Sequence, residues 1–245
     1  MEQAQTPVPE RPDTFLETAV KQFAKRGLML CVVLFLVEVA LFFIISSLPF
    51  FPGEKSFYTN QSNSISTEFQ NASLPVEFWG IFTNNYMIAL REFIPVLGPI
   101  LFGASLYATA RVIEIIALNS TPPVSPLVVV LVLLLFFPHS WIELPAYAVA
   151  TAESLFLTYA VVKWLFDTKG GTIKWGAEFG QFLIYLAIVT VMLLVAALFE
   201  SVEIQIGLLF WVTWIPFAGI IVVVILLYHR LNKIRESMKA PAAVV

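Results

Sequence analysis

LMLCVVLFLVEVALFFIISSL, residues 28–48, decides the fold, because it is apolar at nearly every position and long enough to cross a bilayer. A helix rises about 1.5 Å per residue, so about 20 residues span the hydrocarbon core. Only Glu38 interrupts the run, and Pro49 ends it. Basic residues precede the run, and it is longer than the core of a cleaved signal peptide, so we predict an uncleaved membrane-crossing helix.

The composition extends this conclusion to the whole chain. Of the 245 residues, 59% are hydrophobic and 13% are charged, which is more apolar surface than a water-soluble domain can bury. The predicted fold class is all-α, a polytopic transmembrane helix bundle with about six spans and one short interfacial or re-entrant helix at 77–92. The other apolar runs that could span are 94–118, 127–138, 141–166, 179–199 and 206–228.

Lys and Arg set the expected orientation and domain organisation. We expect the protein in the plasma membrane. Both ends of the chain are basic, so both are expected on the cytoplasmic side. The number of membrane crossings must then be even. We expect a tail with an amphipathic helix at 1–27, a transmembrane domain at 28–229 with an external loop at 49–77, and a basic tail at 230–245.

Two short segments leave the middle of this map open. In the preferred map, 127–138 spans the membrane and 77–92 lies at the outer surface, which gives six crossings. If 127–138 is the re-entrant segment instead, six crossings remain and the middle of the map inverts.

The external loop carries two N-glycosylation patterns, which begin at Asn60 and Asn71. The single cysteine, Cys31, cannot form an internal disulfide. Glycosylation patterns in a chain with so few cysteines are compatible with an archaeal membrane protein.

Several function classes find no support in the sequence. The formal net charge of −3 does not suggest a nucleic-acid partner, and no phosphate-binding glycine loop is present. With only His139 and His229, the sequence assigns no metal site, no cofactor and no catalytic residue. The expected partners are the lipid bilayer and another membrane protein or further copies of the chain.

Ionisable residues inside the apolar runs are the candidate functional residues. A charge at the centre of a membrane helix costs about 2.5–3.5 kcal/mol, which about 20 apolar residues at roughly −0.3 to −0.6 kcal/mol each can offset. Such charges should face protein or water. Arg111 and Glu114 are spaced to share a helix face, as a mutually neutralised pair or as part of a gate or polar path. The others are Glu38, His139, Glu143 and Glu153.

The segment from Pro138 to Ala146 is the most unusual, because it places His139 and Glu143 one helical turn apart between two prolines. A helix broken here would expose backbone carbonyls at membrane depth, which is tolerated only inside protein or beside water. A structural polar cluster, an ion or substrate path and a catalytic metal all remain open.

Residues 78–152 resemble the stage II sporulation protein M family. The resemblance rests on Ile81-Phe82-Thr83-Asn84-Asn85, on the helix with Gly98 and Gly103, and on the 138–146 segment, in which Ser140 replaces the family's usual glycine. It implies a membrane scaffold, as in the sporulating bacteria where the family member joins wall-remodelling enzymes. The family motif and polar core would include Asn84, Asn85, Arg111, Glu114, His139, Glu143 and Glu153.

Three functions are therefore considered. The first is a non-enzymatic membrane scaffold or subunit of a larger complex. The second is a channel or permease subunit with a polar path at Arg111, Glu114, His139 and Glu143. The third is an intramembrane metal-dependent hydrolase that uses His139 with Glu143 or Glu153.

Overall fold

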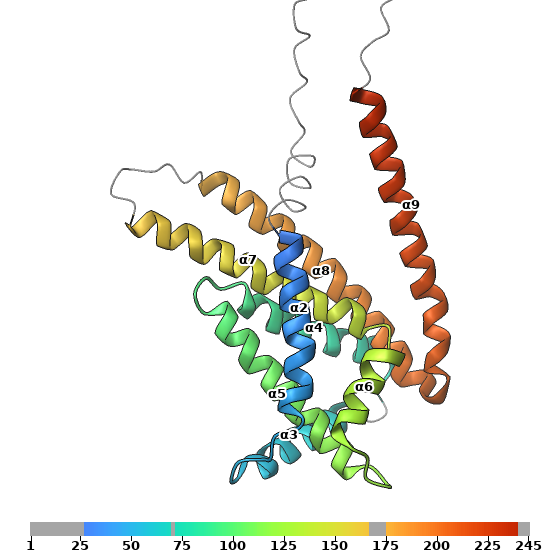
Figure 1. Ribbon diagram of the computed structural model, residues 1–245. Coiled ribbons are helices and arrows are strands. Elements are labelled where there is room, and N and C mark those ends of the chain that lie inside the picture. The colour runs from blue at the N-terminus through green and yellow to red at the C-terminus, as the bar shows by residue number, and fades with distance from the viewer. Residues whose placement is uncertain (1–26, 70–71, 167–174, 240–245) are drawn as a thin grey trace, which may run out of the picture.

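A computed structural model describes residues 27–69, 72–166 and 175–239 of the chain, and the predicted tail helix at 1–27 lies almost wholly outside these ranges. The described residues form an all-α helical bundle, which confirms the predicted fold class (Figure 1). The elements are α2 (Leu28–Ile45), α3 (Glu54–Phe69), α4 (Leu74–Glu92), α5 (Gly98–Asn119), α6 (Pro126–Phe136), α7 (Ser140–Phe166), α8 (Trp175–Ile206), the 3-10 helix η2 (Gly207–Thr213) and α9 (Trp214–Lys239).

Five helices in the described ranges are long and apolar enough to cross a membrane: α2, α5, α7, α8 and Leu209–Arg230, which combines η2 with α9. Helix α6 is apolar but has only 11 residues. Helix α7 begins before Pro145 and continues through it. The predicted external loop is itself largely helical, since α3 occupies most of it. Asn60 is exposed on α3, whereas Asn71 lies outside the described residues.

Helix α4 lies antiparallel along α8. Near one end, Gln205 Nε2 donates a hydrogen bond to Glu77 Oε2 (2.9 Å). At the other end, the rings of Phe93 and Phe182 meet edge to face with centroids 5.4 Å apart. Helix α8 is one of the candidate spans, and α4 accompanies it over most of its length, so the packing places α4 beside a candidate span. Its buried residues include Ile81, Asn85 and Ala89, which recur every four residues and form one face of the helix.

The second half of α5 lies beside the end of α2. Arg111 donates hydrogen bonds to the carbonyls of Leu48 (2.8 Å) and Pro49 (3.2 Å), so the turn after α5 is at the same end of the bundle as α3. Figure 1 shows α3 and the α5–α6 turn together at the lower end, with the first turn of α2 and the last turn of α9 toward the upper end. This packing favours the second map: α4 crosses, and α6 is the short helix that leads into α7.

Helix α7 is the centre of the bundle and packs against α8, α2, α4 and α5. Four alanines at alternate positions have no exposed surface, so neighbouring helices approach α7 closely on several sides. They are Ala146, Ala148, Ala150 and Ala152.

The turn between α4 and α5 is docked against the second half of α7. Ser154 Oγ donates to the carbonyl of Ile94 (2.7 Å), and the N–H of Val96 donates to Thr158 Oγ1 (2.7 Å). A Cβ atom at Gly98 would collide with the Glu92 carbonyl oxygen and with the side chain of Ser154. Gly98 is therefore required for this close approach, whereas Gly103 has open space around it.

The first prediction tests the membrane map. A cysteine at Ser125 should react with an impermeant maleimide from the same membrane face as a cysteine at Lys55, and from the face opposite to one at Arg91. All three positions are exposed, and the native Cys31 is buried and gives little background. Labelling of the Lys55 and Arg91 variants from one common face, with Ser125 labelled from the other, would support the map in which α4 does not cross.

The second prediction concerns Gly98. Gly98→Ala should destabilise the bundle by about 1–3 kcal/mol, because the colliding carbonyl belongs to the backbone and cannot rotate away. Gly103→Ala, in the same helix, should leave stability unchanged or raise it by about 0.5–1 kcal/mol. Thermal unfolding of the purified variants in one detergent measures both, and equal behaviour of the two variants would contradict the assigned role of Gly98.

Candidate functional site

Two polar centres lie inside the bundle, and the first surrounds Arg111, which has no exposed surface. Its Nη1 donates to Glu114 Oε2 (2.6 Å), so the two residues that share a helix face are paired. Its Nη2 donates to the hydroxyl of Tyr107 (3.2 Å), and its Nε lies 3.2 Å from Glu54 Oε1. The Tyr107 hydroxyl in turn donates to Glu54.

Arg111 thus joins three elements. Its partners come from the end of α2, from α3 and from α5, and its guanidinium also lies over the rings of Phe50 and Tyr107, 4.9 and 5.1 Å from their centroids. Six polar partners, the carbonyls of Ile45, Leu48 and Pro49 with Glu54, Tyr107 and Glu114, replace the water that the cation lost. The arrangement is a closed ion-pair network that fixes α3 to the bundle.

Glu54, on α3 outside the spanning helices, has a pKa below its ordinary value of 4.5. Burial acts to raise the pKa, but the hydrogen bonds from Tyr107 and from the Phe51 N–H, with the positive charge of Arg111, outweigh it. The carboxylate form of Glu54 is therefore part of the folded arrangement.

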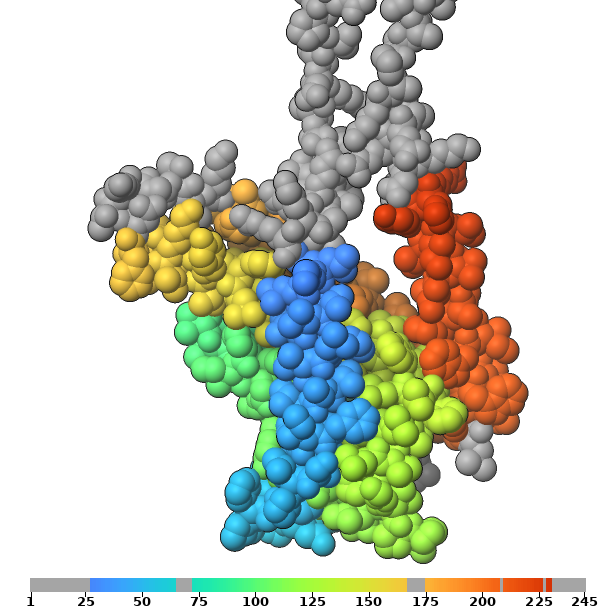
Figure 2. Space-filling view, viewed as in Figure 1, coloured from blue at the N-terminus to red at the C-terminus, as the bar shows by residue number. Residues whose placement is uncertain are grey.

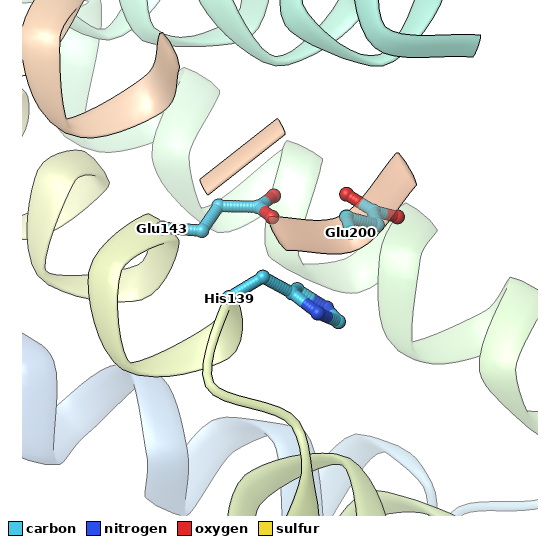
Figure 3. A group of neighbouring side chains, drawn as sticks. All are labelled: His139, Glu143 and Glu200. Carbon is cyan, nitrogen blue, oxygen red and sulfur yellow. The ribbon is translucent and has the colours of Figure 1, made fainter. Parts of the chain in front are cut away.

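The second centre lies at the break between α6 and α7. Figure 3 shows His139, Glu143 and Glu200 with their side chains directed toward one another, from the start of α7 and from α8. One possible ligand atom from each residue lies within 4.8 Å of the other two. The hydrogen bond from the Glu143 N–H to the His139 carbonyl (2.9 Å) starts α7 and sets these two side chains one turn apart.

Further side chains orient the members of this centre. His139 Nδ1 is paired with Glu203 Oε2, and the other oxygen of Glu203 accepts a hydrogen bond from Thr213 Oγ1 (3.1 Å). Tyr147 donates its O–H to Glu143 Oε1 (2.8 Å). Glu200 Oε2 is buried and has no hydrogen-bond partner.

Indole groups cap the backbone at the helix break. Trp214 Nε1 donates to the carbonyl of Phe136 (2.7 Å), and Trp141 Nε1 donates to the carbonyl of Leu134 (2.5 Å). These carbonyls belong to the last turn of α6, where the helix no longer supplies amide donors. Two carbonyls at the break near Pro138 are thus paired with side chains of the protein itself.

The remaining predicted residues are divided between interior and surface. Asn84 is exposed and donates to Asn85 Oδ1 (3.1 Å), while Asn85 is buried. Glu38 and Glu153 are 2% and 1% exposed, and neither belongs to the group around His139.

Sequence reasoning missed Glu200 and Glu203 as members of the site. The predicted spans 179–199 and 206–228 leave both residues in a connection between two helices, and this was wrong: α8 continues through both of them to Ile206. The physical reason is that Glu203, 3% exposed, faces His139 and not water. Their spacing of three residues was the available signal, because it puts two carboxylates on one side of a helix.

Within the described residues, buried charge is strongly unbalanced. Arg111 is the one buried basic side chain, and it is already shared by Glu54 and Glu114. Six glutamates are buried, namely Glu38, Glu77, Glu92, Glu114, Glu153 and Glu203. Because an ionised carboxylate in a low dielectric needs a positive partner, the interior around α7 has to hold protons or cations.

The third prediction concerns the Arg111 network. Glu54→Gln should destabilise the protein at pH 7 by about 1.5–3 kcal/mol, the range for a hydrogen bond to a charged group. A carboxylate with a lowered pKa stabilises the fold above its unfolded value near 4.5 and loses this effect as pH falls through the lowered pKa. The difference between wild type and variant, measured by thermal unfolding, should therefore shrink below pH 4.5. Lys55→Gln, at an exposed neighbour, is the control and should show no such difference.

The comparisons with known proteins extend the motif-based resemblance. The family model described as stage II sporulation protein M matches residues 31–202, which is more than half of the chain and includes α2 to most of α8. No curated protein and no solved structure matches the chain. The matched range contains Asn85, Arg111, His139, Glu143 and Glu200, and α9 lies beyond it. The chain therefore belongs to the stage II sporulation protein M family.

Proposed function

We propose that the protein is a non-enzymatic scaffold that joins another integral membrane protein through α9. The observation that carries this proposal is the isolation of α9 from the rest of the molecule. The spanning window that contains it is 11% buried, compared with 22–39% for the other four candidate spans. Figure 2 shows α9, in red and orange, standing apart from the bundle along its upper part.

The exposure of α9 extends around the whole helix. Seven consecutive residues, Ile220 to Leu226, are each between 41% and 62% exposed. Successive residues on a helix point about 100° apart, so seven of them cover every direction. No side of this part of α9 is therefore covered by the described bundle, and all of it is open to lipid or to another helix.

The occupant that fits this surface is a transmembrane helix of a second membrane protein. Lipid tails are as apolar as leucine, so helices associate in a membrane through close packing, and small residues permit it. Gly219 has nothing within 4 Å of the position of a Cβ atom, so another backbone can approach α9 there. Membership of a family whose sporulation member acts as a membrane scaffold supports the same role.

Helix α9 lies outside the range that the family model matches. Family membership therefore supports a scaffold role for the helical bundle. The proposed partner contact on α9 is particular to this chain. We expect the partner to be a protein distinct from the bundle itself, bound side by side with α9 within the membrane.

The fourth prediction tests this contact in native membranes. A photo-crosslinking residue at Val223 should give one product with a single integral membrane protein, and Gly219→Leu should abolish this product by blocking close approach. The same residue at Leu36 on α2, which is 59% exposed and faces outward, is the matched control and should give no protein product.

Two differently tagged copies of the chain distinguish the outcomes of this experiment. A product that contains both tags would show a homo-oligomer and would overturn the distinct partner. Equal products from Val223 and Leu36, or none from Val223, would overturn the role of α9.

A further inference from the structure

We propose that His139, Glu143 and Glu200 form a binding site for a divalent transition-metal ion of the zinc class. The inference is independent of the scaffold role, because it concerns the interior of the bundle and not α9. The sequence left a metal at His139 and Glu143 open, and only the fold adds Glu200, because it brings α8 to the start of α7.

The ligand types and their spacing support this assignment. An imidazole nitrogen and two carboxylate oxygens are a donor set that Zn²⁺ accepts, and three protein ligands leave a fourth position open. Two ligand atoms that are each about 2.1 Å from one ion lie at most about 4.2 Å apart. The three atoms here lie within 4.8 Å of one another. Side-chain movements that shorten these distances by less than about 1 Å would let all three atoms bind one ion.

The surrounding hydrogen bonds are those expected around metal ligands. A ligand histidine usually gives its other ring nitrogen to a carboxylate, which fixes the ring. Here Glu203 pairs with Nδ1 of His139, so Nε2 would be the atom that binds the ion. Thr213 in turn donates a hydrogen bond to Glu203. Tyr147 donates a hydrogen bond to Oε1 of Glu143, so Oε2 would be the atom that binds the ion.

Glu200 supplies the second, independent observation. Its Oε2 atom is buried without a hydrogen-bond partner, which is costly for a carboxylate oxygen. The neighbouring acidic groups, Glu143 and Glu203, increase the local negative charge, and Arg111 is occupied by Glu54 and Glu114. A divalent cation satisfies the oxygen and neutralises the cluster at once.

The ion would join the start of α7 to the end of α8. Thr213 connects the same cluster to η2, from which α9 departs, so the site lies at the base of α9. A bound ion would therefore hold the break after α6 in one conformation.

The fifth prediction tests the site on the purified full-length chain in detergent. After treatment with a chelator, the protein should bind one equivalent of Zn²⁺ added alone, measured by elemental analysis after gel filtration. Zn²⁺ should also raise the thermal unfolding temperature. Co²⁺ added in place of Zn²⁺ should give a visible absorption spectrum of a protein-bound ion, which reports directly on ligation.

Conservative variants separate ligation from folding. Glu200→Gln and Glu143→Gln should lose the Co²⁺ spectrum, and Glu203→Gln should weaken affinity about 10–100-fold, because it supports a ligand and is not one itself. Glu92→Gln removes another buried carboxylate, which is held by Ser105 and not by the cluster, and should bind like wild type.

The proposal is overturned if wild type binds less than one equivalent at micromolar Zn²⁺, or if Glu200→Gln binds as wild type does. Loss of binding in Glu92→Gln as well, with all variants folded by circular dichroism, would also overturn it. None of these outcomes depends on α9, so the scaffold role is tested separately.

Discussion

The structure depends on one constraint: lipid cannot solvate a charge or an unpaired backbone group, so every polar group at depth needs a partner inside the protein. Arg111 meets this constraint through the carbonyls, carboxylates and hydroxyl that surround its guanidinium. The broken helix near Pro138 shows the same for the backbone, where two indole N–H groups cap the end of α6. The packing of the bundle follows from these pairings as much as from its apolar faces.

The two polar centres differ in how completely their charges are balanced. Around Arg111, one cation faces two carboxylates that hydrogen bond to it or to its neighbours, and the centre fastens α3 to α5. Around His139, three glutamates face a single imidazole, and Glu200 keeps an unpaired buried oxygen. A network whose charges are paired is sufficient for a structural role. An incomplete one at membrane depth calls for a ligand, and for this reason the proposed ion site lies at His139 and not at Arg111.

The family match and the packing divide the molecule in the same place. Residues 31–202 match the family model and contain both polar centres except Glu203, while α9 follows beyond the match and lies apart from the bundle. Bundle and α9 meet at η2, where Thr213 contacts Glu203. A partner bound to α9 and an ion bound at His139 would thus lie on the two sides of η2, which joins α9 to the bundle.

The sequence by itself determined that the chain is an all-α membrane protein, because long apolar runs have no other stable environment, and its motifs indicated the family. It also selected His139, Glu143 and the Arg111–Glu114 pair, because local spacing places such residues on one helix face. Only the tertiary structure showed that α4 accompanies α8 and that Glu54, Glu200 and Glu203 complete the two centres. The reason is physical: hydropathy measures how well each segment alone suits lipid, whereas a polar helix such as α4 becomes acceptable at depth only when its neighbours cover its charges.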